Sequence, residues 1–209
     1  MNTNKLSILV IEDKPENIEA ARLSLADHNV TIVSGFDKAM GALNRGLNGT
    51  GYDCKKSGQV PFDVVLTDCM FPKGGMACMG SKGQAVVNCQ GEMPYGPMVV
   101  FHAIEAGVPN IGLITQGNHH DDPFVFAFDT LRGWKSGKVS VVITSNLDCL
   151  VYTKDGQLVD TASDVYANHS KEKEEGRVRW VKDWRCLLNT ILGLEKEDVG
   201  MIDQSRRQI

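Results

Sequence analysis

The sequence lacks several patterns that would assign a protein to a common class. It contains six cysteines but no Cys-x-x-Cys pair, so neither a disulfide framework nor a standard zinc site is indicated. A zinc site could use Cys54, Cys69, Cys78 and Cys89, although their spacing fits no known ligand pattern. No apolar run approaches the roughly 18 residues of a membrane span, and no signal-type segment precedes the first apolar strand. We therefore expect a cytoplasmic protein with no membrane partner.

The chain also lacks an excess of positive charge. Its 22 Lys and Arg residues are outnumbered by 26 Asp and Glu residues, and the net charge is -4. Nucleic-acid binding needs a basic face, so we expect no nucleic-acid partner. The length of 209 residues, with 42% hydrophobic and 23% charged residues and no internal repeat, is typical of a globular domain. The sequence therefore predicts a single domain over residues 1–209.

Acidic residues follow two apolar runs in the first third of the chain. The run over 62–67 is short and rich in β-branched residues, which predicts a buried parallel strand that ends at Asp68. A similar run over 6–11 leads directly into Glu12 and Asp13. Open α/β sheets place their chemistry at the carboxyl ends of strands, and Mg²⁺ prefers the oxygen ligands that such acids offer. We expect one site with three carboxylates; the alternative is that these acids are solvated loop residues.

Strands and helices are predicted to alternate along the rest of the chain. Further strands are expected at 30–33, 111–115 and 138–144. Three helices are expected to begin at residues with N-terminal signals, Pro15, Phe36 and Pro97. A fourth is expected over the apolar segment 123–131. Strands that alternate with helices in this way give a parallel sheet with helices on both faces.

Three segments interrupt this alternation. The glycine-rich ranges 46–60 and 73–96 are predicted insertions, and the second is longer than ordinary connections. The third, 147–170, is expected to hold a hairpin around Asp155. After it, a final helix is predicted to place five apolar residues on one face: Val178, Val181, Trp184, Leu188 and Ile191.

Together these stretches resemble the receiver domain of response regulators, which work in two-component signalling. The matching residues are 8–13 around the end of the first strand, 63–72 around the third strand, and 111–115 in the fourth. The resemblance implies an α/β, flavodoxin-like, doubly wound sheet of five parallel strands in the order 2-1-3-4-5. It also implies a phosphorelay module whose partners are a histidine kinase or phosphotransfer protein and a downstream protein.

The resemblance further implies roles for five positions. Asp68 would be the phosphoacceptor, so that the chain would become a phosphoprotein, and Thr115 would be the switch hydroxyl. The Mg²⁺ ligands would be Glu12, Asp13, Asp68 and the backbone carbonyl of Met70. A carboxylate can attack phosphorus when a cation neutralises the charge on both oxygens. The chemistry implied is therefore autocatalytic phosphoryl acceptance, and we do not expect a conventional metabolic enzyme.

Two features of the sequence depart from the family. The family's fifth strand normally ends in a lysine, whereas the strand at 138–144 is followed by Ser145; Lys154, after a later apolar run, is the remaining candidate. The 73–96 insertion stands directly beside the acceptor, Asp68. These departures motivate an alternative function, a phosphorylation-independent pseudo-receiver used as a protein-binding module.

Two further motifs imitate the signatures of enzymes. The run over 117–121, with His119 and His120, resembles an element of metallophosphoesterases, but the chain has no Asp-x-His pair, which that family needs. Residues 155–160 imitate the haloacid-dehalogenase signature, with Thr153 in the place of its nucleophilic aspartate. We predict a polar loop for the first motif and a hairpin turn for the second.

Overall fold

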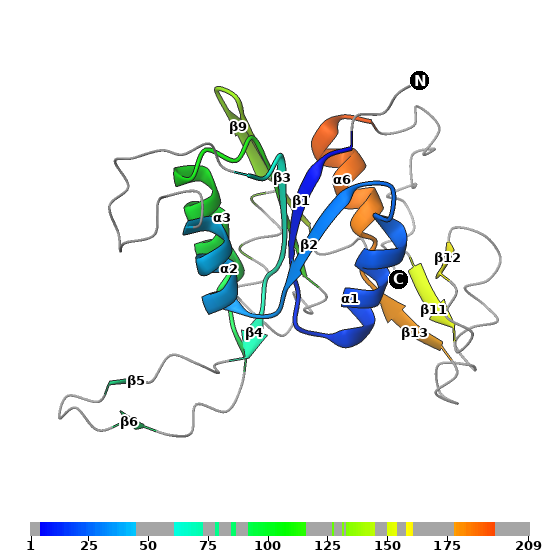
Figure 1. Cartoon of the computed structure of the whole chain (residues 1–209), viewed down its shortest axis with the longest axis horizontal. Helices are drawn as coiled ribbons and strands as arrows, with labels where there is room; N and C mark the ends of the chain where they lie inside the picture. The colour runs from blue at the N-terminus through cyan, green and yellow to red at the C-terminus, as the bar shows by residue number, and fades with distance from the viewer. Residues whose placement is uncertain are drawn as a thin grey trace, which may run out of the picture.

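The protein is an α/β structure with a mostly parallel central sheet (Figure 1). The computed structural model describes residues 5–44, 61–72, 78–79, 85–86, 92–115, 127, 131, 133–144, 150–153, 158–160 and 178–194. Within these ranges, the alternation of strands and helices that the sequence predicted is confirmed from the first strand to the fourth. The predicted insertion at 46–60 lies outside the described residues.

The central sheet has six strands in the order β2-β1-β3-β8-β10-β9. Their bounds are β1 (Ser7–Ile11), β2 (Asn29–Val33), β3 (Val64–Asp68), β8 (Asn110–Ile114), β9 (Gly133–Ser136) and β10 (Val139–Thr144). All pairings are parallel except that of β9, which runs antiparallel to β10 at the edge. The expected count of five strands was therefore one too low, because the short turn between β9 and β10 allows an added hairpin strand. The helix predicted over 123–131 falls mostly outside the described residues.

Helices cover both faces of the central sheet, with α2 and α3 on one face and α1 and α6 on the other (Figure 1). Their bounds are α1 (Pro15–Ser24), α2 (Phe36–Asn44), α3 (Gly96–Glu105) and α6 (Trp184–Leu192). Strand β1 contributes Leu9 and Ile11 to the first core and Ile8 and Val10 to the second. Successive side chains of a strand point to opposite faces, so a strand covered on both sides must be apolar throughout.

A second, antiparallel sheet of three strands has the order β12-β11-β13. Its strands are β11 (Leu150–Thr153), β12 (Leu158–Asp160) and β13 (Val178–Val181). The pairing of β11 with β12 confirms the predicted hairpin strands, while the turn at Asp155 and the candidate Lys154 lie outside the described residues. Two short pairs complete the strands, β4 (Phe71–Pro72) with β7 (Glu92–Met93) and β5 (Cys78–Met79) with β6 (Ala85–Val86).

The prediction that Val178 and Val181 belong to the final helix is wrong. Both residues lie on β13, which pairs with β11, and the helix begins only at Trp184. Branched and aromatic side chains suit a strand in this segment. Asp183 then caps the helix, because its side chain accepts a hydrogen bond from the Cys186 backbone N–H at 2.8 Å.

Candidate functional site

The three predicted carboxylates lie together at the carboxyl ends of two neighbouring strands. Strand β1 pairs in parallel with β3, and this pairing places Ile11 opposite Thr67. Glu12 and Asp13 therefore follow β1 at the level where Asp68 ends β3. The nearest oxygens of the three acids all lie within 4.8 Å of one another. The structure thus brings the three acids together, while their roles toward a metal or a phosphoryl group stay predictions.

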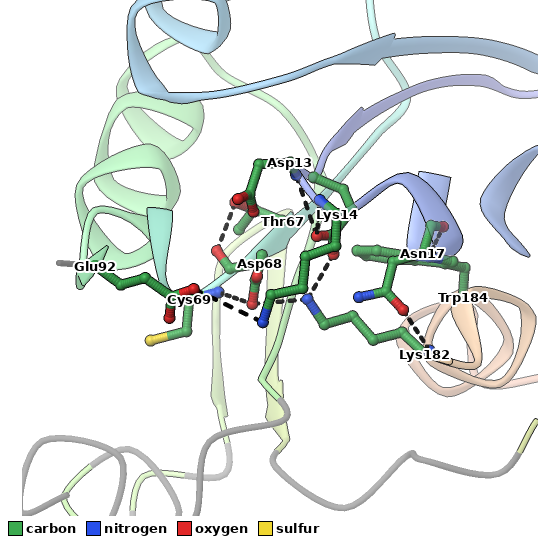
Figure 2. A network of polar contacts seen from close by, with 10 residues as sticks. Asp13, Lys14, Asn17, Thr67, Asp68, Cys69, Glu92, Lys182 and Trp184 are labelled. Carbon is green, nitrogen blue, oxygen red and sulfur yellow. Dashed lines mark hydrogen bonds and ion pairs between the residues drawn. The ribbon is translucent and has the colours of Figure 1, made fainter. Parts of the chain in front are cut away.

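A lysine that the sequence analysis missed lies among these acids. The Lys182 side chain is fully buried, and its Nζ is 2.5 Å from Glu12 Oε2 and 2.8 Å from Asp68 Oδ1. Figure 2 shows this ammonium group reaching into the site from the side opposite Glu92. A buried ammonium between two carboxylates is stable only because all three charges are paired. The site is therefore a buried cluster of charges rather than a loose group of surface acids.

The sequence pattern hides Lys182 because the helix predicted from Val178 onward covers the segment that forms β13. It directly follows β13, so it stands at a strand end as Glu12 and Asp68 do. Two signals in the sequence point to this arrangement: the strand-forming run before Lys182, and the capping residue Asp183 after it. Neither signal reveals which strands lie next to β13.

Both carboxylate oxygens of Glu12 have partners. Oε1 accepts hydrogen bonds from the backbone N–H groups of Asp13, at 3.1 Å, and Lys14, at 2.9 Å. Oε2 accepts from the Lys182 ammonium. Glu12 is thus held by the turn that follows β1 and by Lys182, and its negative charge acts at a fixed position. Among the described residues, Oε2 accepts only this one hydrogen bond, so it keeps a lone pair that could face a metal ion.

Asp13 has the carboxylate oxygen best placed to bind a cation, and Asp68 lies beside it. Asp13 Oδ1 is buried and has no hydrogen-bond partner among the described residues. Asp68 Oδ1 accepts from the Cys69 backbone N–H at 2.7 Å as well as from Lys182. A buried polar atom without a partner is costly unless a ligand or water satisfies it. This all-oxygen donor set suits Mg²⁺, which commonly takes one or two carboxylates and keeps several waters.

The electrostatic environment favours the charged form of Lys182 and disfavours the charged forms of Glu12 and Asp13. Burial raises the pKa of Glu12 above its usual 4.5, although Lys182 opposes this effect. Burial and the neighbouring Asp68 charge raise the pKa of Asp13 above 3.8. Burial by itself would lower the pKa of Lys182, but Asp68 and Glu12 outweigh it and raise that pKa above 10.5. The amine therefore stays protonated at neutral pH.

The contribution of Asp13 to the stability of the metal-free protein should decrease as the pH rises through the pKa of Asp13. The folded state binds this proton more tightly than the unfolded state, whose pKa is near 3.8. The stability contributed by protonated Asp13 is therefore fully present below that pH and is lost as the pH rises through the raised folded pKa. Urea unfolding with a chelator, from about pH 4 to about pH 7, should show that Asp13→Asn gains stability relative to wild type. A constant difference between the two proteins would contradict this expectation.

The backbone around Asp68 is in close contact with the start of α3. The Gly96 backbone N–H donates to the Cys69 carbonyl at 2.9 Å. A Cβ on Gly96 would lie 2.2 Å from the Asp68 carbonyl oxygen and 2.7 Å from Cys69 Cα, so no side chain fits there. The requirement for glycine at residue 96 thus follows from the close approach of α3 to the residues around Asp68.

A second lysine and a fourth acid lie at the rim of the site. Lys14 Nζ is 3.8 Å from Glu92 Oε1, and both side chains are partly exposed. Glu92 lies on β7, which pairs with β4, the strand that follows β3 in the chain. Figure 2 shows the Lys14 side chain running past Asp68 toward Glu92. Exposed pairs of this kind contribute little to stability, so their influence is on the charge at the rim of the site.

The structure describes two of the remaining predicted site residues, Thr115 and Met70. Thr115 is buried directly after β8, next to Ile114, the residue opposite Asp68 in the sheet. Met70 lies two residues after Asp68, between β3 and β4, and the role of its carbonyl stays a prediction. His119 and His120 lie outside the described residues, as do Cys54, Cys89 and Cys149.

The comparisons with known proteins identify no relative. No protein-family model, no curated protein and no solved structure matches this chain. Among the described residues, no helix combines the length and the apolar character needed to cross a membrane. Functional inference therefore depends on the geometry of the site and on the sequence resemblance.

Proposed function

We propose that this chain is a receiver-like signalling module that accepts a phosphoryl group on Asp68. The main support is the buried Lys182 ammonium, which bridges Glu12 and Asp68 at the carboxyl ends of β1 and β3. A phosphoryl acceptor needs a carboxylate nucleophile and fixed positive charge beside it. The lysine missing from the fifth strand was the main departure from the receiver family, and Lys182 supplies the same charge from another strand.

The order of the parallel strands supports the finer assignment of the fold. Strands β2-β1-β3-β8-β10 follow the flavodoxin-like order 2-1-3-4-5, with β9 added at one edge. In such sheets, ligands bind beyond the carboxyl ends of the strands, where the strand order reverses. Strands β1 and β3 are neighbours at that point, and they deliver Glu12, Asp13 and Asp68.

Asp68, Lys182 and Asp13 would each have a separate role in phosphoryl transfer. A carboxylate oxygen of Asp68 would attack phosphorus, forming a phosphorus–oxygen bond while the donor's leaving group departs with its electron pair. The Lys182 ammonium would neutralise charge on the transferring group, because it has three N–H donors and two of them face Glu12 and Asp68. Asp13 and Asp68 would hold Mg²⁺, which supplies further positive charge at the phosphoryl oxygens when bound.

The alternative function is a pseudo-receiver that binds partners without phosphorylation. One observation favours it: Lys182 already pairs with two of the three acids, so part of the negative charge is offset without a metal. The missing lysine of the fifth strand no longer supports this alternative, because Lys182 lies next to Asp68. In either case the partners would be proteins: a histidine kinase or phosphotransfer protein upstream for the receiver, and a downstream partner for both.

A small phosphodonor distinguishes the two functions. Incubation of the full chain with acetyl phosphate and Mg²⁺ should add one phosphoryl group, visible by intact mass, and chelation of the metal should prevent the addition. Asp68→Asn is the matched control, since it keeps the size of the side chain and removes the nucleophile; it should gain no phosphoryl group. If wild type remains unmodified, or if Asp68→Asn is labelled as fully as wild type, the phosphoacceptor proposal fails.

A further inference from the structure

Backbone pairing within the central sheet does not position Lys182. It directly follows β13, which pairs with β11 in the separate three-stranded sheet. The partner of β8 on the far side from β3 is β10, so no backbone ladder connects β13 with β3. Packing of α6 against β3 and β8, together with contacts of Lys182 itself, must therefore fix the distance between its ammonium and Asp68.

Asn17 on α1 makes one of these contacts with Lys182. Its side-chain Oδ1 accepts a hydrogen bond from the Lys182 backbone N–H at 3.1 Å. Its backbone carbonyl accepts from the Trp184 ring Nε1–H at 3.0 Å. Asn17, Lys182 and Trp184 are each fully buried, so these bonds are shielded from water.

Trp184 holds the lysine side chain from a second direction. The Lys182 Nζ lies 5.6 Å from the centroid of the Trp184 ring, within the range of a cation–π interaction. Figure 2 shows Asn17 and Trp184 beside Lys182, on the side of the site away from Glu92. Asn17 thus fixes both the backbone of Lys182 and the ring next to its ammonium group.

We propose that Asn17 is a positioning residue that aligns Lys182 with Asp68. Helix α1 begins at Pro15, three residues after Glu12, so Asn17 belongs to the segment that delivers the first two acids. The Asn17 amide therefore sets the position of Lys182 relative to Glu12 without any help from sheet pairing. A side chain without an acceptor oxygen at residue 17 would leave the Lys182 backbone N–H without this bond and allow the lysine to shift.

The kinetic consequence rests on the proposed function, phosphoryl transfer to Asp68. Misplacement of a catalytic group by about 1 Å can cost about a hundredfold in rate. Asn17→Leu keeps the approximate size and removes the acceptor oxygen, so the rate of labelling by acetyl phosphate should fall about a hundredfold. Asn17→Gln keeps a neutral amide with an acceptor oxygen and should retain more of the rate than Asn17→Leu. Similar rates in the Leu and Gln variants would overturn the proposal.

Two controls separate positioning from a general loss of stability. Ile191→Val removes one methylene from the core that contains Trp184 and changes no polar group; it should label at the wild-type rate. In a Lys182→Met background, Asn17→Leu should cause no further loss, because residues that act through one another are not additive. Additive losses would overturn the proposal. If Asn17→Leu does not fold, Asn17→Ala, which also lacks the acceptor, takes its place in both experiments.

A second measurement does not depend on phosphorylation. An amine-reactive reagent, followed by peptide mass spectrometry, gives the reactivity of Lys182 relative to the partly exposed Lys14. The wild-type ratio should be low, and it should rise several-fold in Asn17→Leu but not in Ile191→Val. An unchanged ratio in Asn17→Leu would overturn the inference even if Asp68 is phosphorylated. A raised ratio in a protein that accepts no phosphoryl group would support the positioning role and reject only the proposed function.

Discussion

Lys182→Met should lower the free energy of unfolding by about 3–5 kcal/mol at neutral pH, measured without divalent cations. The substitution removes the ammonium but keeps a side chain of similar length. Glu12 and Asp68 would then be buried carboxylates without a counter-charge, which is the costly half of a broken buried ion pair. Burial raises the pKa of Glu12, and protonation of Glu12 would remove one of these charges, so the loss should be smaller in mildly acidic solution.

Lys14→Met is the matched control for this substitution. Lys14 is a partly exposed lysine at the rim of the same site, and its partner Glu92 is also partly exposed. Its loss should therefore cost no more than about 1 kcal/mol. Adding Asp68→Asn to Lys182→Met should restore part of the lost stability, because one unpaired charge disappears. Urea denaturation measures all four proteins; equal losses for the two lysine substitutions would show that Lys182 is not the buried counter-charge.

Magnesium should stabilise the wild-type protein by about 2.7 kcal/mol at one hundred times its dissociation constant. Asp13→Asn should abolish this effect, because Asp13 Oδ1 is the buried carboxylate oxygen without a partner among the described residues. A Mg²⁺ titration followed by thermal or urea unfolding measures the response. Since Lys182 already pairs with Glu12 and Asp68, the ion is expected to add to this network rather than replace it.

Glu92→Gln provides the control for the magnesium experiment. Glu92 is a partly exposed acid near Asp13, and its charge contributes to the raised pKa of that residue, but it is not one of the three clustered acids. The Mg²⁺ response of Glu92→Gln should therefore stay close to that of wild type. If stabilisation by Mg²⁺ persists in Asp13→Asn but is lost in Glu92→Gln, the cation binds at the rim of the site instead.

The sequence by itself determined the central strands and the convergence of the acids. Short apolar runs rich in β-branched residues before Glu12 and Asp68 favour strands buried on both faces, and parallel strands end at the same edge of a sheet. The prediction of one acidic site thus needed only the strand order and the position of each acid at a strand end. Local patterns were sufficient because each acid directly follows its own strand.

Only the tertiary structure decided which cation completes the site. Lys182 is 170 residues from Glu12, and its strand belongs to a different sheet from β1 and β3. A short apolar segment such as 178–181 suits either a strand or a helix, and its pairing with β11 resolved that ambiguity. The contact between Asn17 and Lys182 likewise arises from the packing of α1 against β13. Such contacts depend on the free energy of the whole fold, because no local pattern of residues specifies a partner so distant in the chain.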